Sequence, residues 1–376
     1  MENTWTIRWL ATLWIITGLT NISSSQETIH HTQGETKFLI TGNAQATFSA
    51  NKDENQFGDL AFKPIFLWSL SDRLFIESEI EIATGEGSVE VVLEYANMAY
   101  RINKYLTFHA GRFLPKFGGY WGRLGEGFLN RFSTDPAGFG DGGIGPRIEM
   151  GAGLQGGAQL GKSKVNYDFY IADGPQLLIG SVDAPDEAGQ MQYEPYVDNN
   201  KNKAIGGRIG FLPIPSSTLE LGISFEHAGQ TGDQQTEFQK TPANMYALDL
   251  NYYQMINPIN SILRINGEWK KMEVGDVNYP NIETETGTYT FHNASSAYYA
   301  QASLRPTGAA KTWLNNTELA VRFSRFNTPV GALWSGSNRT DLGIDYWLKW
   351  NAVFKLGYEI ETDLPSTLFT QLVYGF

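Results

Sequence analysis

The chain has no cysteine, few histidines and no long apolar run beyond its N-terminal segment. The absence of cysteine from all 376 residues excludes disulfides and thiolate metal sites. A transmembrane helix needs about 18 or more consecutive apolar residues, and the sequence after the N-terminal segment offers none. The formal net charge of −12 argues against nucleic-acid binding.

Residues 1–25 have the pattern of a secretory signal peptide. Arg8 supplies a positive charge, an apolar segment follows it, and the small residues Ser23 and Ser25 fit a cleavage site. The alternative is a membrane anchor, but the apolar segment is too short to span a bilayer. We therefore predict export, with a signal peptide at 1–25 and a flexible segment at 26–35.

Apolar and polar residues alternate along nearly all of the remaining sequence. Between residues 74 and 83, for example, Ile76, Ile80 and Ile82 alternate with glutamates. This period of two is typical of β-strands that have one apolar and one polar face. In the next alternating segment, the apolar residues up to Tyr95 are predicted to form a row that faces lipid. The alternating segments together indicate about sixteen strands between residues 36 and 376.

Short and long connections alternate between these segments. Short links such as Ser71-Asp72 follow long ones, which include 50–59 and the longest of all, 114–147. Outer-membrane barrels have this asymmetry, with tight periplasmic turns, long external loops and an even strand number. A soluble β-sandwich also alternates apolar and polar residues, but it is not expected to keep this rhythm. The sequence also ends in an alternating segment whose last residue, Phe376, is aromatic, as is usual in such barrels. We predict an all-β protein: one closed antiparallel transmembrane β-barrel over 36–376, in the cell outer membrane.

One stretch of sequence carries a family resemblance. The segment LEYANMAYRINKYLTFHAGRFLPKFGGY (93–120) has an acidic strand, a tyrosine-rich return strand and a GRFLPKFG turn. It resembles porins of the phosphate-selective porin O and P type, and more closely their relatives in Bacteroidota. YIADGP at 170–175 is similar to the strand-to-loop junction of that family. The resemblance implies a passive, water-filled barrel that is often a homotrimer.

Alternation also predicts which charged side chains face the lumen. An acidic wall is expected on the third and fourth strands, formed by Glu77, Glu79, Glu81, Glu90 and Glu94. A basic wall is expected on the eleventh to thirteenth strands, formed by Arg264, Lys270, Arg305 and Arg322. Eight strands separate the two groups, so in a sixteen-stranded barrel they face each other across the pore. Such walls are a usual selectivity device, and the alternative is that these charges only keep the lumen hydrated.

The segment 114–147 is expected to fold into the lumen and form its constriction. Its glycines permit tight turns, and its aromatic residues are too apolar for a loop that is fully exposed to water. The charged residues expected at the constriction are Lys116, Arg123, Glu126, Arg131 and Asp135. We expect the basic ones to contact Glu77, Glu79 and Glu81. The alternative is an outward fold that covers a neighbouring subunit of a trimer.

An enzymatic barrel, such as an outer-membrane phospholipase, is the main alternative of another class. It requires a nucleophile, a base and an orienting group within reach of one another. Neither His109 nor the other histidines accompany a recognisable serine motif, so no catalytic residue is assigned. No regular calcium-loop pattern occurs, so we predict no metal and no cofactor.

The sequence therefore predicts a passive diffusion porin for small hydrophilic solutes or ions. Its expected partners are outer-membrane lipid and lipopolysaccharide, these solutes and other copies in a homotrimer, but not nucleic acid. Two alternatives remain: a channel selective for an anion or an oligomeric nutrient, and a structural or adhesion barrel whose lumen is plugged.

Overall fold

A computed structural model describes residues 37–85, 88–140, 142–234, 236–281 and 287–376. The signal peptide predicted at 1–25 and the segment at 26–35 lie outside these described residues.

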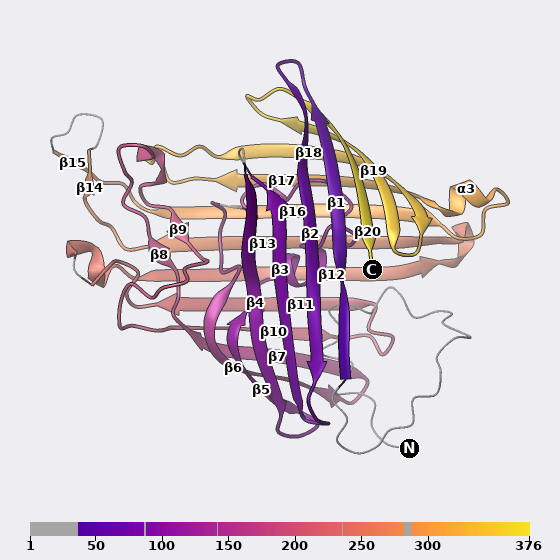
Figure 1. Cartoon of the computed structure of the whole chain (residues 1–376), viewed down its shortest axis with the longest axis horizontal. Helices are drawn as coiled ribbons and strands as arrows, with labels where there is room; N and C mark the ends of the chain where they lie inside the picture. The colour runs from indigo at the N-terminus through magenta and orange to yellow at the C-terminus, as the bar shows by residue number, and fades with distance from the viewer. Residues whose placement is uncertain (1–36, 86–87, 141, 235, 282–286) are drawn as a thin grey trace.

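Sixteen antiparallel strands form one closed barrel (Figure 1). Each barrel strand pairs with the next one along the chain, and β1 pairs with β20 to close the ring. The predicted fold class is therefore confirmed. The barrel strands are β1 (Lys37–Ala50), β2 (Asn55–Ser69), β3 (Leu74–Thr84), β4 (Val89–Arg101), β5 (Leu106–Phe113), β6 (Glu149–Leu160), β7 (Ser163–Ala172), β10 (Ala204–Leu212), β11 (Leu219–Ala228), β12 (Ala243–Ile256), β13 (Ser261–Val274), β16 (Ala294–Pro306), β17 (Thr317–Asn327), β18 (Ser337–Lys349), β19 (Ala352–Glu361) and β20 (Thr367–Gly375).

The connections divide the barrel into two ends, which we call the long-loop end and the short-turn end. Figure 1 shows β8, β9, β14 and β15 gathered at the long-loop end and α3 at the opposite end. The small elements in the connections are α2 (Tyr120–Leu124), β8 (Gln176–Leu177), η1 (Pro185–Glu187), β9 (Met191–Gln192), η2 (Glu237–Lys240), η3 (Asn257–Ile259), β14 (Tyr279–Pro280), β15 (Thr288–Tyr289) and α3 (Thr312–Asn315). Within the described ranges, no helix is long and apolar enough to cross a membrane.

The first connection is shorter than predicted. A long loop is expected at 50–59, but β1 continues to Ala50 and β2 already begins at Asn55. The Asn51 side chain closes the turn, because its Oδ1 accepts hydrogen bonds from the backbone N–H groups of Asp53 (2.8 Å) and Glu54 (2.9 Å). An asparagine that bonds to backbone groups two and three residues ahead is a usual turn former, so the pattern of alternation alone was a poor guide here.

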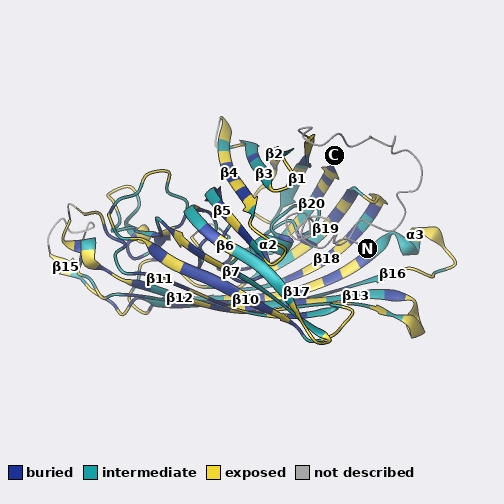
Figure 2. Cartoon of the chain, turned by 90° about the horizontal axis from the view of Figure 1, so that it is seen from below, coloured by how far each residue is buried: buried dark blue, intermediate teal, exposed yellow. Residues whose placement is uncertain are grey.

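The outer surface of the barrel is apolar where the strands are regular. On β12 the outward residues Tyr246, Leu248 and Leu250 are 44%, 52% and 37% exposed, whereas Ala247 and Asp249 between them are buried. Figure 2 shows the same alternation of exposed and buried residues along other strands. We call this band of outward apolar side chains the apolar belt. A large exposed apolar surface is what a lipid-facing barrel presents, and a soluble monomer rarely has one.

An irregularity in β4 changes which residues face the lumen. Glu79 of β3 pairs with Tyr95, but the next residue, Ile80, pairs with Leu93, so Glu94 is an extra residue in the ladder. A bulge of this kind shifts the alternation of the strand by one position. Leu93 therefore lies on the outer face, 40% exposed. Tyr95 lies on the inner face, where its hydroxyl is hydrogen-bonded to Glu79. The prediction that Tyr95 faces lipid is wrong for this reason.

The last residue of the chain takes part in closing the barrel. The N–H of Gly42 donates to the Phe376 carbonyl (3.2 Å), and the N–H of Phe376 donates to the Gly42 carbonyl (3.1 Å). The Thr41 hydroxyl donates to the same Phe376 carbonyl (2.7 Å). The Phe376 ring stacks on Phe62 with a centroid separation of 5.3 Å. Phe376 is thus bonded to β1 and packed against β2.

Candidate functional site

The connection from β5 to β6 turns into the barrel instead of crossing its rim. The backbone N–H of Gly118 donates to Ser224 Oγ on β11 (2.9 Å). The N–H groups of Gly119 and Tyr120 both donate to Oε2 of Glu268 on β13 (2.7 Å each). Gly118 has φ +68°, and a Cβ atom there would lie 1.8 Å from Glu268 Oε1, so this approach requires glycine. Glu268 is 3% exposed and holds the start of α2.

Further along, the same connection reaches a second part of the wall, about four strands further round the ring. Arg131 Nε donates to Glu318 Oε1 on β17 (2.9 Å). The Thr134 hydroxyl donates to Glu359 Oε2 on β19 (2.8 Å), and Lys355 Nζ on β19 donates to the Phe132 carbonyl (3.3 Å). The segment 114–147, which we call the inward loop, therefore crosses the interior from β11–β13 to β17–β19, and Figure 2 shows α2 within the ring of strands.

An apolar cluster holds the middle of the inward loop against one side of the wall. The rings of Tyr120, Phe139 and Tyr299 meet edge to face at centroid distances of 5.0 to 5.5 Å. The inner faces of β12, β13 and β16 supply small or flexible apolar side chains to this cluster, namely Ala243, Met245, Ala247, Met272 and Ala297. Burial of these apolar surfaces stabilises the loop in its inward position.

The five residues of the acidic wall occupy different environments. Glu77, Glu79 and Glu81 alternate along the inner face of β3, and Glu94 is the extra residue at the bulge of β4. Glu81 forms an ion pair with Lys63 Nζ on β2 (2.7 Å), and a Glu94 carboxylate oxygen lies 3.8 Å from an Arg147 nitrogen. Glu90 is exposed at the start of β4. In the part of the chain that the structure describes, no cation lies within ion-pair distance of Glu77 or Glu79.

The four residues of the basic wall lie on the inner faces of β13, β16 and β17, close to acidic or aromatic side chains. Arg322 Nε is 2.7 Å from Asp341, and Arg264 Nη1 is 2.8 Å from Glu318. Lys270 Nζ is 3.5 Å from Glu268. The Arg305 guanidinium lies over the Trp347 ring, 5.2 Å from its centroid, and its Nε donates to the Asn315 carbonyl (2.9 Å). The basic wall thus lies eight strands from the acidic wall, and three of its four cations are ion-paired.

The five charged residues expected at the constriction all have polar partners. Lys116 Nζ donates to Gln155 Oε1 (2.9 Å), and Arg123 is ion-paired with Glu220 on β11. Asn43 donates to Glu126 (2.7 Å), Arg131 pairs with Glu318, and the Tyr120 hydroxyl donates to Asp135 (2.6 Å). Burial lowers the pKa of Lys116 and raises the pKa of Glu126. The side chains of this set span the width of the interior.

The expected contacts between the basic loop residues and Glu77, Glu79 and Glu81 do not occur. Lys116, Arg123 and Arg131 instead use partners on β6, β11 and β17. An alternating pattern assigns residues to a face of the wall, but it does not reveal the path of a loop across the lumen. The cation that the loop brings nearest to the acidic wall is Arg147, at its far end.

Sequence reasoning also missed several lumenal cations, including the following three. Lys63 pairs with Glu81 on the acidic wall. Arg208 on β10 makes ion pairs with Asp249 (2.7 Å) and Glu220 (2.9 Å). Lys355 is 2% exposed and donates to the inward loop. Alternation would have identified these cations, since each is a polar residue at an inward position of a strand. The prediction considered only the strands of the acidic and basic walls.

A closed sixteen-stranded barrel with an apolar outside, a charged inside and one long connection folded across its interior has the porin fold. No family model matches the chain, and no curated protein matches it. Solved structures do match its fold. The outer-membrane channel DcaP of Acinetobacter baumannii superposes with a TM-score of 0.59 at 10% identity, covering 91% of this chain and 97% of that one.

Two further porin structures give the same result. OmpF of Salmonella typhi, in complex with daunomycin, has a TM-score of 0.59 at 11% identity and covers 90% of this chain and 97% of its own. An anion-selective porin from Comamonas acidovorans has a TM-score of 0.54 at 14% identity, over 91% of this chain and all of its own. The predicted likeness to porins is therefore confirmed as a likeness of fold, while the likeness to the phosphate-selective type stays a prediction.

Proposed function

We propose that this protein is a passive diffusion porin of a Gram-negative outer membrane, exported through its N-terminal segment. Small hydrophilic solutes or ions pass through the barrel, and no turnover is involved. The observation that carries the proposal is the inward loop, in which Arg123 is held by Glu220 on β11 and Glu126 by Asn43 on β1, eight strands apart in the ring. A loop held in this way narrows a channel at a fixed height, and charged residues on both sides then act on the solute at close range.

The acidic wall supports a preference for cations. Glu77 and Glu79 have no ion-pair partner among the described residues, and Glu126 of the inward loop accepts a hydrogen bond from the Asn43 amide on β1, while Lys63 and Arg147 act on it at longer range. The basic wall on the opposite side is mostly neutralised by Asp341, Glu318 and Glu268. The two walls together produce a transverse field, in which the uncompensated charge is negative.

A selective anion channel is the second candidate, and one cluster favours it. Arg264 and Arg305 are diagonal neighbours on the inner faces of β13 and β16, because Arg264 pairs with Ser303 and Arg305 with Ile262. Together with Arg131, they form a group of three arginines around Glu318. Such a group recognises oxyanions well. The resemblance to phosphate-selective porins and the similarity of fold to an anion-selective porin also favour an anion channel.

Planar-bilayer recording of the purified protein in a salt gradient tests these candidates together. Step increases in conductance support a channel, and the sign of the reversal potential separates the candidates. A reversal potential with the sign expected for cation selectivity supports the first candidate. One with the sign expected for anion selectivity supports the second. A correctly folded protein that produces no conductance steps contradicts both and favours a plugged barrel. Chemical cross-linking in the same detergent tests the homotrimer, which rests on the fold alone.

A further inference from the structure

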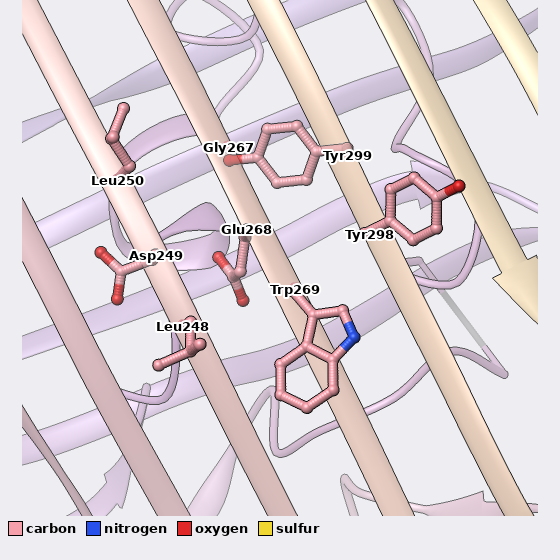
Figure 3. A pocket seen from close by; sticks show the side chains of 8 residues that line it. All are labelled: Leu248, Asp249, Leu250, Gly267, Glu268, Trp269, Tyr298 and Tyr299. Carbon is pink, nitrogen blue, oxygen red and sulfur yellow. The ribbon is translucent and has the colours of Figure 1, made fainter.

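The outer face of the barrel has a hollow in its apolar belt. Figure 3 shows the eight residues that line it, on the adjacent strands β12, β13 and β16. Its volume is about 430 Å³. The hollow exists because Gly267 occupies an outward position of β13 between Ile265 and Trp269 and has no side chain to fill it. A Cβ atom at Gly267 would make one tight contact, 3.3 Å from the Tyr299 carbonyl oxygen, and its next neighbour would be Ala300 Cα at 4.0 Å.

The rim of this hollow is apolar and aromatic. Outward side chains of Leu248 and Leu250 border it on β12, Trp269 on β13 and Tyr298 on β16. The other lining residues, Asp249, Glu268 and Tyr299, have side chains buried on the inner face, so they contribute backbone to its floor. A hollow of this lining within the belt suits one hydrocarbon chain better than any polar ligand.

Two outward cations lie next to the hollow on the side of the long-loop end. Lys271 is the next outward residue on β13 after Trp269, and Arg325 stands on β17 directly opposite Tyr298, which itself pairs with Trp269. Arg325 is exposed and its Nε donates to Asn327 Oδ1 (2.7 Å). Lys271 is paired with Glu273, and both side chains are about 40% exposed.

We propose that this surface binds a phosphorylated glycolipid of the lipid A type, with one acyl chain in the hollow and its phosphates on Lys271 and Arg325. The proposal rests on the proposed function, because it requires the long-loop end to face the outer leaflet. The two cations are separated by β16, which matches a headgroup that carries more than one phosphate better than a phospholipid with one. Guanidinium and ammonium groups are the usual partners of such phosphates.

Binding of purified lipid A to the detergent-solubilised protein, measured by native mass spectrometry, tests the proposal. Lys271→Gln combined with Arg325→Gln should weaken binding by about tenfold or more, since two charge-assisted contacts are lost. Gly267→Leu, which fills the hollow, should also weaken it. Glu273→Gln should strengthen binding, because it frees Lys271 for the phosphate.

Matched controls keep this experiment decisive. Lys104→Gln removes a cation from a turn at the short-turn end, and Ala158→Leu enlarges an outward residue on β6; both should bind lipid A as the parent does. Equal binding by the parent and by the variants at Lys271 and Gly267 would overturn the proposal. So would equally tight binding of phosphatidylglycerol, which would indicate a general anionic-lipid surface. If all variants still conduct ions, failure of lipid A binding leaves the proposed function intact.

Discussion

The β2–β4 side and the β12–β17 side of the barrel interior both carry charged residues, but they differ in how those charges are compensated. On the β2–β4 side, Glu77 and Glu79 have no ion-pair partner among the described residues. On the β12–β17 side, Glu268 and Glu318 bind the inward loop, and the neighbouring cations are paired with them. Charge therefore serves to fix the loop on one side, whereas on the other side the half-buried Glu77 and the buried Glu79 are carboxylates without a paired cation.

Removal of the inward loop should have the largest effect on this difference. Deletion of 119–140 removes the aromatic anchor and the partners of Glu268 and Glu318, while the strands of the barrel are untouched. Single-channel conductance should rise several-fold and ion selectivity should weaken. A deletion of 182–187, which shortens a different loop at the same end, serves as the control and should leave conductance unchanged. Unchanged conductance after the 119–140 deletion, with loss of an oligomer, would show that the loop covers a neighbouring subunit instead.

The anchoring side is tested more finely at Glu268. Glu268→Ala removes the acceptor of two backbone N–H groups and leaves Lys270 buried without its carboxylate, which typically costs about 3–5 kcal/mol. The unfolding free energy in urea should fall by that order, and channel recordings should become noisy as the loop is released. Glu220→Ala on β11 is the comparison, because it removes the ion pair with Arg123 near the end of α2, leaves Arg208 paired with Asp249 and keeps both N–H bonds at the start of α2. A quiet channel with parental conductance in Glu268→Ala would contradict the anchoring role.

The register of the acidic side is tested by charge substitutions on the two faces. Ile80 and Leu93 are paired outward residues, and Tyr95 is inward because of the bulge. Ile80→Arg and Leu93→Arg should each destabilise the barrel, by roughly 2–4 kcal/mol near the middle of the bilayer. Tyr95→Lys should fold and alter ion selectivity. The check is heat-modifiable migration on detergent gels, and a folded Leu93→Arg beside an unfolded Tyr95→Lys would place the bulge elsewhere.

Neutral substitutions compare the two sides by their effect on ion selectivity. Glu77→Gln should reduce the cation preference, since Glu77 is only half-buried on the inner face of β3 and has no ion-pair partner among the described residues. Arg322→Gln should change the reversal potential less and stability more, because that guanidinium is fully buried against Asp341. Reversal potentials in a salt gradient and urea unfolding of both variants provide the two readouts. A larger selectivity change in Arg322→Gln would reverse the assignment of the conducting side.

The smallest expected effect is a pH dependence due to Glu126. Burial disfavours the charged form and raises the pKa of Glu126 above its usual 4.5. On acidification, this residue therefore loses its charge at a higher pH than an exposed glutamate does, and the cation preference should decline in that range. The Glu126→Gln variant should lose this part of the pH dependence. An identical pH profile in the variant would mean that other carboxylates account for the decline.

The sequence predicted the wall of this barrel much better than its interior. Alternation assigns each residue of a regular strand to a face, and it separates Ile80, which pairs with the exposed Leu93, from Glu81, which is ion-paired with Lys63. The bulge at Glu94 was not predictable, since an extra residue leaves the local pattern of apolar and polar residues plausible in either register. Loop partners such as Glu268 and Glu220 depend on contacts between residues more than 90 positions apart, as the Arg123 to Glu220 separation of 97 shows. No local pattern encodes such distances.

The bond between Gly42 and Phe376 has a consequence for how the molecule is made. The two residues that complete the ring are separated by almost the whole chain, so the ring closes only after every intervening strand is available. Contacts at such sequence separation form slowly, because the entropy of a very long loop must be lost first. Until then β1 and β20 each have an unpaired edge, which invites association with other strands. Folding of this protein therefore ends in a single late step, during which the incomplete sheet needs protection from other chains.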